Sequence, residues 1–258
     1  LLFLLALPDI IPWMLGRVRL NREGTPAAFL LLLVTLTIPQ WVAIVGLFQG
    51  ALGLTLANPD PNTGHNIPNA DGSEGEACGN ATRAVAVLHG TAASIETEGG
   101  LLQARPDAAG AEVAMGRARF DWQDIPLAYA MDTREMPLGW DMLERPSAVS
   151  VGNPHLIFFV NDVDAVPLDT LGPEIEHDPL FPERINVNVA QILSRNAIKL
   201  RVWERGAGLT LACGTGACAT ATAAYRQGLV DGDVTVRLPG GTLTIRHDAE
   251  GGIHMAGP

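Results

Sequence analysis

The chain has 258 residues, which is enough for one large domain or two small ones. It carries 28 acidic residues against 17 basic ones, a formal net charge of −11, and it contains no run of five basic residues. This balance argues against a nucleic-acid partner, because phosphate recognition needs clustered Lys and Arg. Three cysteines are too few for a disulfide framework and favour a reducing, cytoplasmic compartment. The six histidines are scattered and form no HExxH pattern, so no metal site is expected.

Residues 1–60 differ in composition from the rest of the chain. Residues 25–59 contain no charged side chain, and about 20 apolar residues suffice to span a bilayer. Membrane contact through this segment is therefore the alternative to a cytoplasmic location. A buried core element, a targeting sequence, or sequence foreign to the rest through a fusion or a shifted reading frame would also fit. The chain opens with Leu1 rather than Met, so we expect its start to be incomplete.

From residue 61 onward, hydrophobic periodicity and turn residues predict an alternation of helices and strands. Residues 58–76 are rich in Asn, Pro, Gly and Asp and predict a loop. The expected elements that follow are a helix at 81–90, strands within 94–120, strand–turn–strand at 147–166, a short helix, loop and strand within 172–193, a strand running into a glycine turn at 196–210, a helix from 213 that stops at Gly228, and a hairpin at 233–247.

The order of these elements indicates a weak internal repeat. Loop, cysteine, helix and strands occur once after residue 60 and again after residue 196. This predicts an α+β fold of two similar lobes, each a mostly antiparallel sheet around a central helix, with a shared cleft between them. We place the lobes at residues 61–118 and 119–258, the first of them incomplete and the last strand able to return to it.

Two of the three cysteines occupy matching positions. Cys78 and Cys213 each follow an alanine, precede a glycine and stand at the start of an Ala-rich helical run. Free backbone N–H groups at a helix start favour a thiolate and can hold a carboxylate. A facing pair of such thiols can invert a stereocentre, since one removes a proton and the other returns one. The alternative is that each is a small buried hydrophobe, which is our interpretation of Cys218.

At these residues the sequence resembles the diaminopimelate epimerase family. NADGSEGEACGNATR (69–83) and VWERGAGLTLACGTGACA (202–219) are similar to its two cysteine motifs. VGNPH (151–155), FPERINVNVAQ (181–191) and the closing MAGP match in order between and after them. The resemblance covers residues 66–258. Residues 1–60 do not match, and the family's N-terminal glycine-rich motif with its substrate-binding Asn is not found there.

The resemblance implies cofactor-independent epimerisation of LL- to meso-diaminopimelate, on the lysine and peptidoglycan route, with neither pyridoxal phosphate nor metal. It implies a small amino acid as substrate, a homodimer as the assembly, and Cys78 and Cys213 as the two acid/base residues. The residues implied to bind substrate are Asn69, Gly79, Asn80, Asn153, Asn186, Glu204, Arg205, Gly214 and Thr215. His155, like Glu204, would assist a thiol or grip an ammonium group.

Most of these residues could equally serve the fold alone. Taken singly, Asn69 and Asn153 could set turns, Asn186 and His155 could be hydrogen-bonded core residues, and Glu204–Arg205 could be a surface ion pair. The chain as a whole could instead be a non-catalytic binding module, a fusion with a membrane segment, or a sister racemase acting on proline or hydroxyproline.

Overall fold

A computed structural model describes residues 79–97, 100–107 and 110–258. The expectations for the apolar segment, Asn69 and Cys78 lie outside these residues. The helices are α5 (Gly79–His89), α6 (Leu168–Glu176) and α7 (Gly214–Arg226). The strands are β1 (Ala93–Thr97), β2 (Gly100–Asp107), β3 (Gly110–Arg117), β4 (Gly139–Trp140), β5 (Leu143–Glu144), β6 (Ser147–Ser150), β7 (Pro154–Phe159), β8 (Asn186–Ser194), β9 (Ala197–Glu204), β10 (Gly208–Thr210), β11 (Asp233–Leu238), β12 (Gly241–His247) and β13 (Gly252–Gly257).

These elements follow the expected order closely. The helix expected at 81–90 begins two residues earlier, and the helix expected from residue 213 begins at Gly214. Two features were not anticipated: the small β4–β5 hairpin, and β10, which folds back to pair with β9 after a turn that contains Gly206 in the left-handed region (φ 73°). None of the described helices is both long and apolar enough to cross a membrane.

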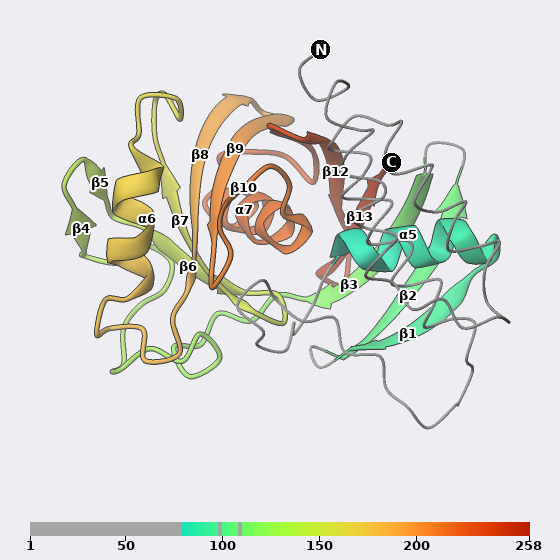
Figure 1. The fold of residues 1–258 in the computed structure, drawn as a ribbon, viewed down its shortest axis with the longest axis horizontal. Helices are drawn as coiled ribbons and strands as arrows, with labels where there is room; N and C mark the ends of the chain where they lie inside the picture. The colour runs from blue at the N-terminus through green and yellow to red at the C-terminus, as the bar shows by residue number, and fades with distance from the viewer. Residues whose placement is uncertain (1–78, 98–99, 108–109) are drawn as a thin grey trace, which may run out of the picture. The chain divides into compact units, whose positions relative to one another are not determined.

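Most of the described strands belong to one sheet, in the order β1-β2-β3-β13-β12-β11-β9-β8-β7-β6. β7 pairs parallel with β8, and β9 parallel with β11, whereas the remaining neighbours along this order run antiparallel. The described part of the chain is thus sheet-rich with few helices, as expected for the α+β class. The C-terminal strand β13 lies between β12 and β3, so it joins the first strands of the described chain to the last ones (Figure 1).

Two helices pack on different parts of this sheet. α5 contacts β1, β2 and β3, whereas α7 contacts strands from β6 round to β13 and also touches α5. The sheet curves around α7 in Figure 1, and the helix is buried from Gly214 to Ala224. Small side chains explain this depth, because Ala and Gly let the surrounding strands approach the helix axis closely. Arg83 of α5 donates to the carbonyl oxygen of Pro258 through Nε (3.2 Å) and Nη2 (3.1 Å), which ties that helix to the end of β13.

The third helix, α6, shapes the turn that follows β9. A Cβ on Gly172 would lie 2.5 Å from the Trp203 ring, so the helix and the strand approach too closely for any other residue. Trp203 Nε1 donates to Oε2 of the buried Glu176 (2.7 Å), and the Gly206 N–H donates to Oε1 of the same carboxylate (3.0 Å). Because Glu176 accepts hydrogen bonds from both ends of the segment 203–206, it fixes the orientation of Glu204 and Arg205, which lie between those ends.

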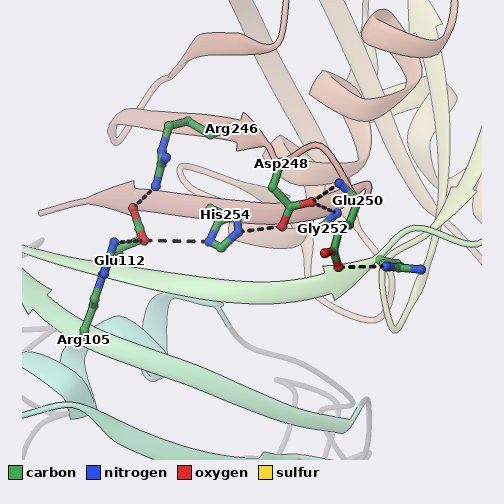
Figure 2. Close-up of polar contacts among 8 residues, drawn as sticks. Arg105, Glu112, Arg246, Asp248, Glu250, Gly252 and His254 are labelled. Atoms are coloured by element: carbon green, nitrogen blue, oxygen red, sulfur yellow. Dashed lines mark hydrogen bonds and ion pairs between the residues drawn. The ribbon is translucent and has the colours of Figure 1, made fainter.

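A row of charged side chains crosses the outer face of β2, β3, β13 and β12 (Figure 2). At its centre, Glu112 accepts from Arg105 Nη2 (2.6 Å) and from Arg246 Nη2, and its side chain is 12% exposed. His254 lies between two carboxylates, 3.7 Å from Glu112 and 3.2 Å from Asp248. Although burial opposes it, the two arginines hold the pKa of Glu112 below its usual value.

This pairing predicts a pH-dependent contribution to stability. A carboxylate whose pKa is lowered by folding stabilises the protein above its unfolded pKa of about 4.3, and this is lost as pH falls through the folded value. We expect Glu112→Gln to lower the free energy of unfolding by about 1 kcal/mol near pH 7, and the difference from wild type to shrink towards about pH 3. Urea unfolding at both pH values measures it. Glu250→Gln is the control, because this 84% exposed side chain pairs only loosely with Arg117 (3.5 Å). Equal pH profiles for the Glu112 and Glu250 variants would contradict the assignment.

Candidate active site

The candidate site is built around Cys213 at the N-terminus of α7. The residue has an extended backbone (φ −132°, ψ 109°), and its Sγ accepts the N–H of Gly216 (3.4 Å), so it caps the helix. A Cβ on Gly216 would lie 3.2 Å from this Sγ and 3.2 Å from Val202, so a larger residue would press on the thiol. The helix start expected at this cysteine is therefore confirmed.

A carboxylate and a hydroxyl contact the same sulfur. The Cys213 thiol donates to Oε2 of Glu204 (3.1 Å), at the end of β9, and Thr215 Oγ1 lies 3.5 Å from Sγ. The thiol is buried, with 3% of the residue exposed. Burial and the negative charge of Glu204 raise the pKa of Cys213 well above its usual value, although the bonds from Thr215 and Gly216 lower it.

A helix start alone is expected to lower the pKa of a cysteine, whereas the pKa of Cys213 is raised. The helix N–H group does favour the thiolate, as predicted, but desolvation and the neighbouring carboxylate outweigh it. Cys213 is therefore held as a thiol in this structure, with a proton ready to be given and a carboxylate positioned to take it.

His155, on β7, lies fully buried in a second part of the site. Its Nε2 faces Asn153 Oδ1 (3.0 Å), and its Nδ1 faces Asn188 Oδ1 (3.3 Å). Asn153 Nδ2 in turn donates to Thr215 Oγ1 (3.3 Å). Burial lowers the pKa of His155 to about 4, and the positive charge of Arg205 contributes in the same direction. The imidazole is thus neutral near pH 7, and a series of polar contacts through Asn153 and Thr215 connects it to Cys213.

Asn186 anchors the turn that carries Glu204 and Arg205. Its Oδ1 accepts the backbone N–H of Arg205 (2.9 Å), and its Nδ2 donates to the carbonyl oxygen of Pro154 (2.8 Å). The Arg205 guanidinium donates to the carbonyl oxygen of Glu183 (3.0 Å). Asn186 thereby connects the segment before His155 with the segment that presents the Glu204 carboxylate.

The structure brings together a subset of the residues implied by the sequence. Polar contacts around the start of α7 link Asn153, His155, Glu204, Cys213 and Thr215, and Gly214 is the first residue of that helix. Asn186 bonds the backbone N–H of Arg205, the residue after Glu204. Gly79 and Asn80 are the first two residues of α5. Asn69 and Cys78 lie outside the described residues, so the predicted pairing of two thiols stays a prediction.

Sequence reasoning missed Asn188. It is fully buried on β8 and bonds His155, Gly216 and Thr220 together. The signal was present in the sequence, because Asn186 and Asn188 stand two apart in NVNVA and alternate residues of a strand share a face. Two amides on one face of an otherwise apolar strand are costly unless each has partners, and that cost points to a polar network.

Comparison with solved structures defines the class of fold. A hydroxyproline epimerase from Agrobacterium vitis superposes with a TM-score of 0.52 at 14% identity, over 71% of this chain and 63% of that chain. A phenazine biosynthesis protein of the PhzF family from Enterococcus faecalis gives a TM-score of 0.51 at 14% identity, over 71% and 70%. The chain therefore has the fold shared by these proteins.

Sequence relatives narrow the class to one family. The Diaminopimelate epimerase family profile matches residues 147–258. The diaminopimelate epimerase of Erythrobacter litoralis is 65% identical over 192 residues, 74% of this chain and 71% of the relative. That of Sphingopyxis alaskensis is 64% identical over 180 residues, 70% and 67% of the two chains. The chain belongs to the diaminopimelate epimerase family.

Proposed function

We propose that the protein interconverts LL- and meso-diaminopimelate by moving a proton at one α-carbon between two thiols, those of Cys78 and Cys213. The observation that carries this proposal is the Cys213 thiol, which caps α7 and donates to Glu204 within a motif of the family. A cysteine that only fills space in the core has no need of a carboxylate at 3.1 Å. The negative charge makes ionisation of the thiol harder, but the carboxylate oxygen is placed to accept the thiol proton.

The acid role of Cys213 follows from its surroundings. As the opposite thiolate removes the α-proton, the Cys213 thiol gives its own proton to the other face of the carbon and becomes a thiolate. The Gly216 N–H and the Thr215 hydroxyl are placed to stabilise that sulfur anion.

In the reverse direction Cys213 must act as a base. Its proton first moves along the 3.1 Å contact to Glu204 Oε2, and the resulting thiolate then removes the α-proton. Glu204 thus supplies the basicity that the buried thiol lacks, while the Cys78 thiol gives its proton to the opposite face of the carbon. After product release, Glu204 loses its proton to solvent and the Cys78 thiolate regains one, so the cycle balances without a cofactor.

The remaining features of the proposal concern the arrangement around the substrate. The helix N-termini at Gly79 and Gly214 would hold the reacting carboxylate, and Arg205 would suit the distal carboxylate with its planar guanidinium. We further propose two lobes, residues 61–118 and 119–258, with the substrate between them and a homodimer as the assembly.

Proton exchange with solvent tests the proposal. We expect the purified protein in deuterated water to interconvert LL- and meso-diaminopimelate and to place deuterium at the inverted α-carbon. Proline and trans-4-hydroxyproline, assayed in parallel by mass spectrometry and chiral chromatography, are expected to remain unlabelled. Labelling of the cyclic substrates instead would assign the chain to a racemase of that type. Binding of diaminopimelate with no deuterium uptake would leave a non-catalytic binding module.

A further inference from the structure

The orientation of the Asn188 side chain is set by its neighbours. Its Nδ2 donates to the carbonyl oxygen of Gly216 (3.1 Å) and to Thr220 Oγ1 (3.0 Å), both in α7. A backbone carbonyl can only accept, so turning the amide round would place two acceptor oxygens against each other in a buried site. Asn188 therefore presents Oδ1, an acceptor, to the imidazole of His155.

This orientation decides which nitrogen of His155 carries the proton. Nδ1 lies 3.3 Å from Asn188 Oδ1, and a hydrogen bond there requires a hydrogen on Nδ1. Nε2 faces Asn153 Oδ1 (3.0 Å), but Asn153 Nδ2 bonds the Thr215 hydroxyl, which can donate as well as accept, so this amide can turn whereas that of Asn188 cannot. The nitrogen that gains and loses a proton is consequently Nε2. Neutral imidazole can carry its hydrogen on either nitrogen, so the choice here comes from the protein.

We propose that Asn188 is a positioning residue, which holds His155 in the Nδ1–H tautomer and so directs Nε2 into a hydrogen-bond chain that runs through Asn153 and Thr215 to Cys213. The successive contacts in this hydrogen-bond chain are His155 Nε2 to Asn153 Oδ1 (3.0 Å), Asn153 Nδ2 to Thr215 Oγ1 (3.3 Å) and Thr215 Oγ1 to Cys213 Sγ (3.5 Å). Its consequence for turnover rests on the proposed function, whereas the tautomer itself does not.

The chain has two polarities, and each matches one state of the site. In the structure Asn153 Oδ1 faces Nε2 and its Nδ2 donates to Thr215, which is the polarity of protonated His155. With neutral His155 the Asn153 amide turns over, so that it donates to Nε2 and accepts from the Thr215 hydroxyl, which then leaves Sγ without that donor. With protonated His155, the Asn153 oxygen accepts from Nε2–H, its NH₂ group donates to Thr215, and the hydroxyl donates to Sγ. The second polarity suits the thiolate of Cys213. A fixed Nδ1–H is the condition for both polarities, because it keeps Nε2 as the end of the chain.

Long-range proton–nitrogen correlation spectra of the full chain with nitrogen-labelled histidine test the tautomer directly. The His155 signals are assigned by their loss in His155→Gln. We expect wild-type His155 to carry its hydrogen on Nδ1 near pH 7 and Asn188→Leu to shift it to Nε2. Thr220→Val is the matched control, because it removes a partner of Asn188 Nδ2 but leaves the Gly216 bond that sets the amide. It should keep Nδ1–H.

Kinetics supply the second readout. We expect Asn188→Leu to lower kcat for diaminopimelate by about tenfold to a hundredfold, with a smaller change in KM and an altered pH profile, because the misplaced proton blocks Nε2. Thr220→Val should show a smaller fall in kcat than Asn188→Leu. Wild-type His155 found with Nε2–H, or Thr220→Val shifting the tautomer as far as Asn188→Leu, would overturn the positioning role. If the wild-type protein has the Nδ1–H tautomer but does not act on diaminopimelate, only the proposed function is overturned. The wild-type spectrum tests the tautomer even if Asn188→Leu does not fold.

Discussion

Replacing Cys213 with serine is expected to lower kcat for epimerisation by at least about a thousandfold. The hydroxyl preserves the cap on α7 and the contact with Glu204, but it is a far weaker acid than a thiol. It therefore neither gives a proton to the carbon readily nor forms the anion that would remove one. Without a donor on its face, the carbanion formed at the other face can only be reprotonated where it arose. Chiral chromatography of LL- and meso-diaminopimelate, combined with deuterium uptake, measures both processes.

Two features make this result diagnostic. The variant should lose inversion more completely than exchange, since Cys78 can still swap the α-proton of one stereoisomer for deuterium. Cys218→Ser provides the matched control, because Cys218 lies fully buried inside α7, where burial raises its pKa to about 12. We expect that variant to retain kcat within about threefold. Wild-type inversion by the Cys213 variant would remove this residue from the reaction.

Replacing Glu204 with glutamine is expected to have the second largest effect, a fall in kcat of about a hundredfold. The amide keeps the shape of the side chain but cannot take the thiol proton. The same change removes a negative charge that raises the pKa of Cys213, so the thiol should ionise at lower pH than in wild type. The variant would thus combine a more reactive cysteine with a slower enzyme.

Alkylation of Cys213 by iodoacetamide, followed across pH by peptide mass spectrometry, measures this shift. The mapping separates Cys213 from the other two cysteines. Thr215→Val is the control of opposite sign, because the Thr215 bond lowers the pKa of Cys213 and its loss should move alkylation to higher pH. Both variants moving in the same direction would mean that general loosening of the site, rather than these contacts, controls the thiol.

Several parts of the fold could be predicted because they depend on neighbours in the chain. The start of α7 is an example: the Gly216 N–H reaches back three residues to Cys213, and the Ala-rich run continues the helix. The predicted hairpin of β11 and β12 is present, although its two-residue turn is Pro239–Gly240 and Gly241 already pairs with Leu238 as the first residue of β12. The position of β10 was missed, because its three residues carry too little pattern to separate them from a turn.

The polar network could be predicted only in part. Asn153, His155 and Asn186 were found through motif resemblance, whereas Asn188 looked like one more residue of a buried strand. Its partner His155 lies 33 residues away, and the parallel pairing of β7 with β8 brings the two together. Such pairing depends on the whole sheet, and no local pattern specifies it.

By itself the sequence determined the order of helices and strands in the described chain, the cap at Cys213 and the family to which the chain belongs, because each rests on contacts between near neighbours or on motifs read in order. The sequence allowed the last strand to return to the first lobe, but only the tertiary structure decided its place between β12 and β3, the partners of Asn188, and the direction in which the pKa of Cys213 moves. The physical reason is that burial and the approach of a distant carboxylate or amide arise from packing, and packing is a property of the assembled sheet and helices.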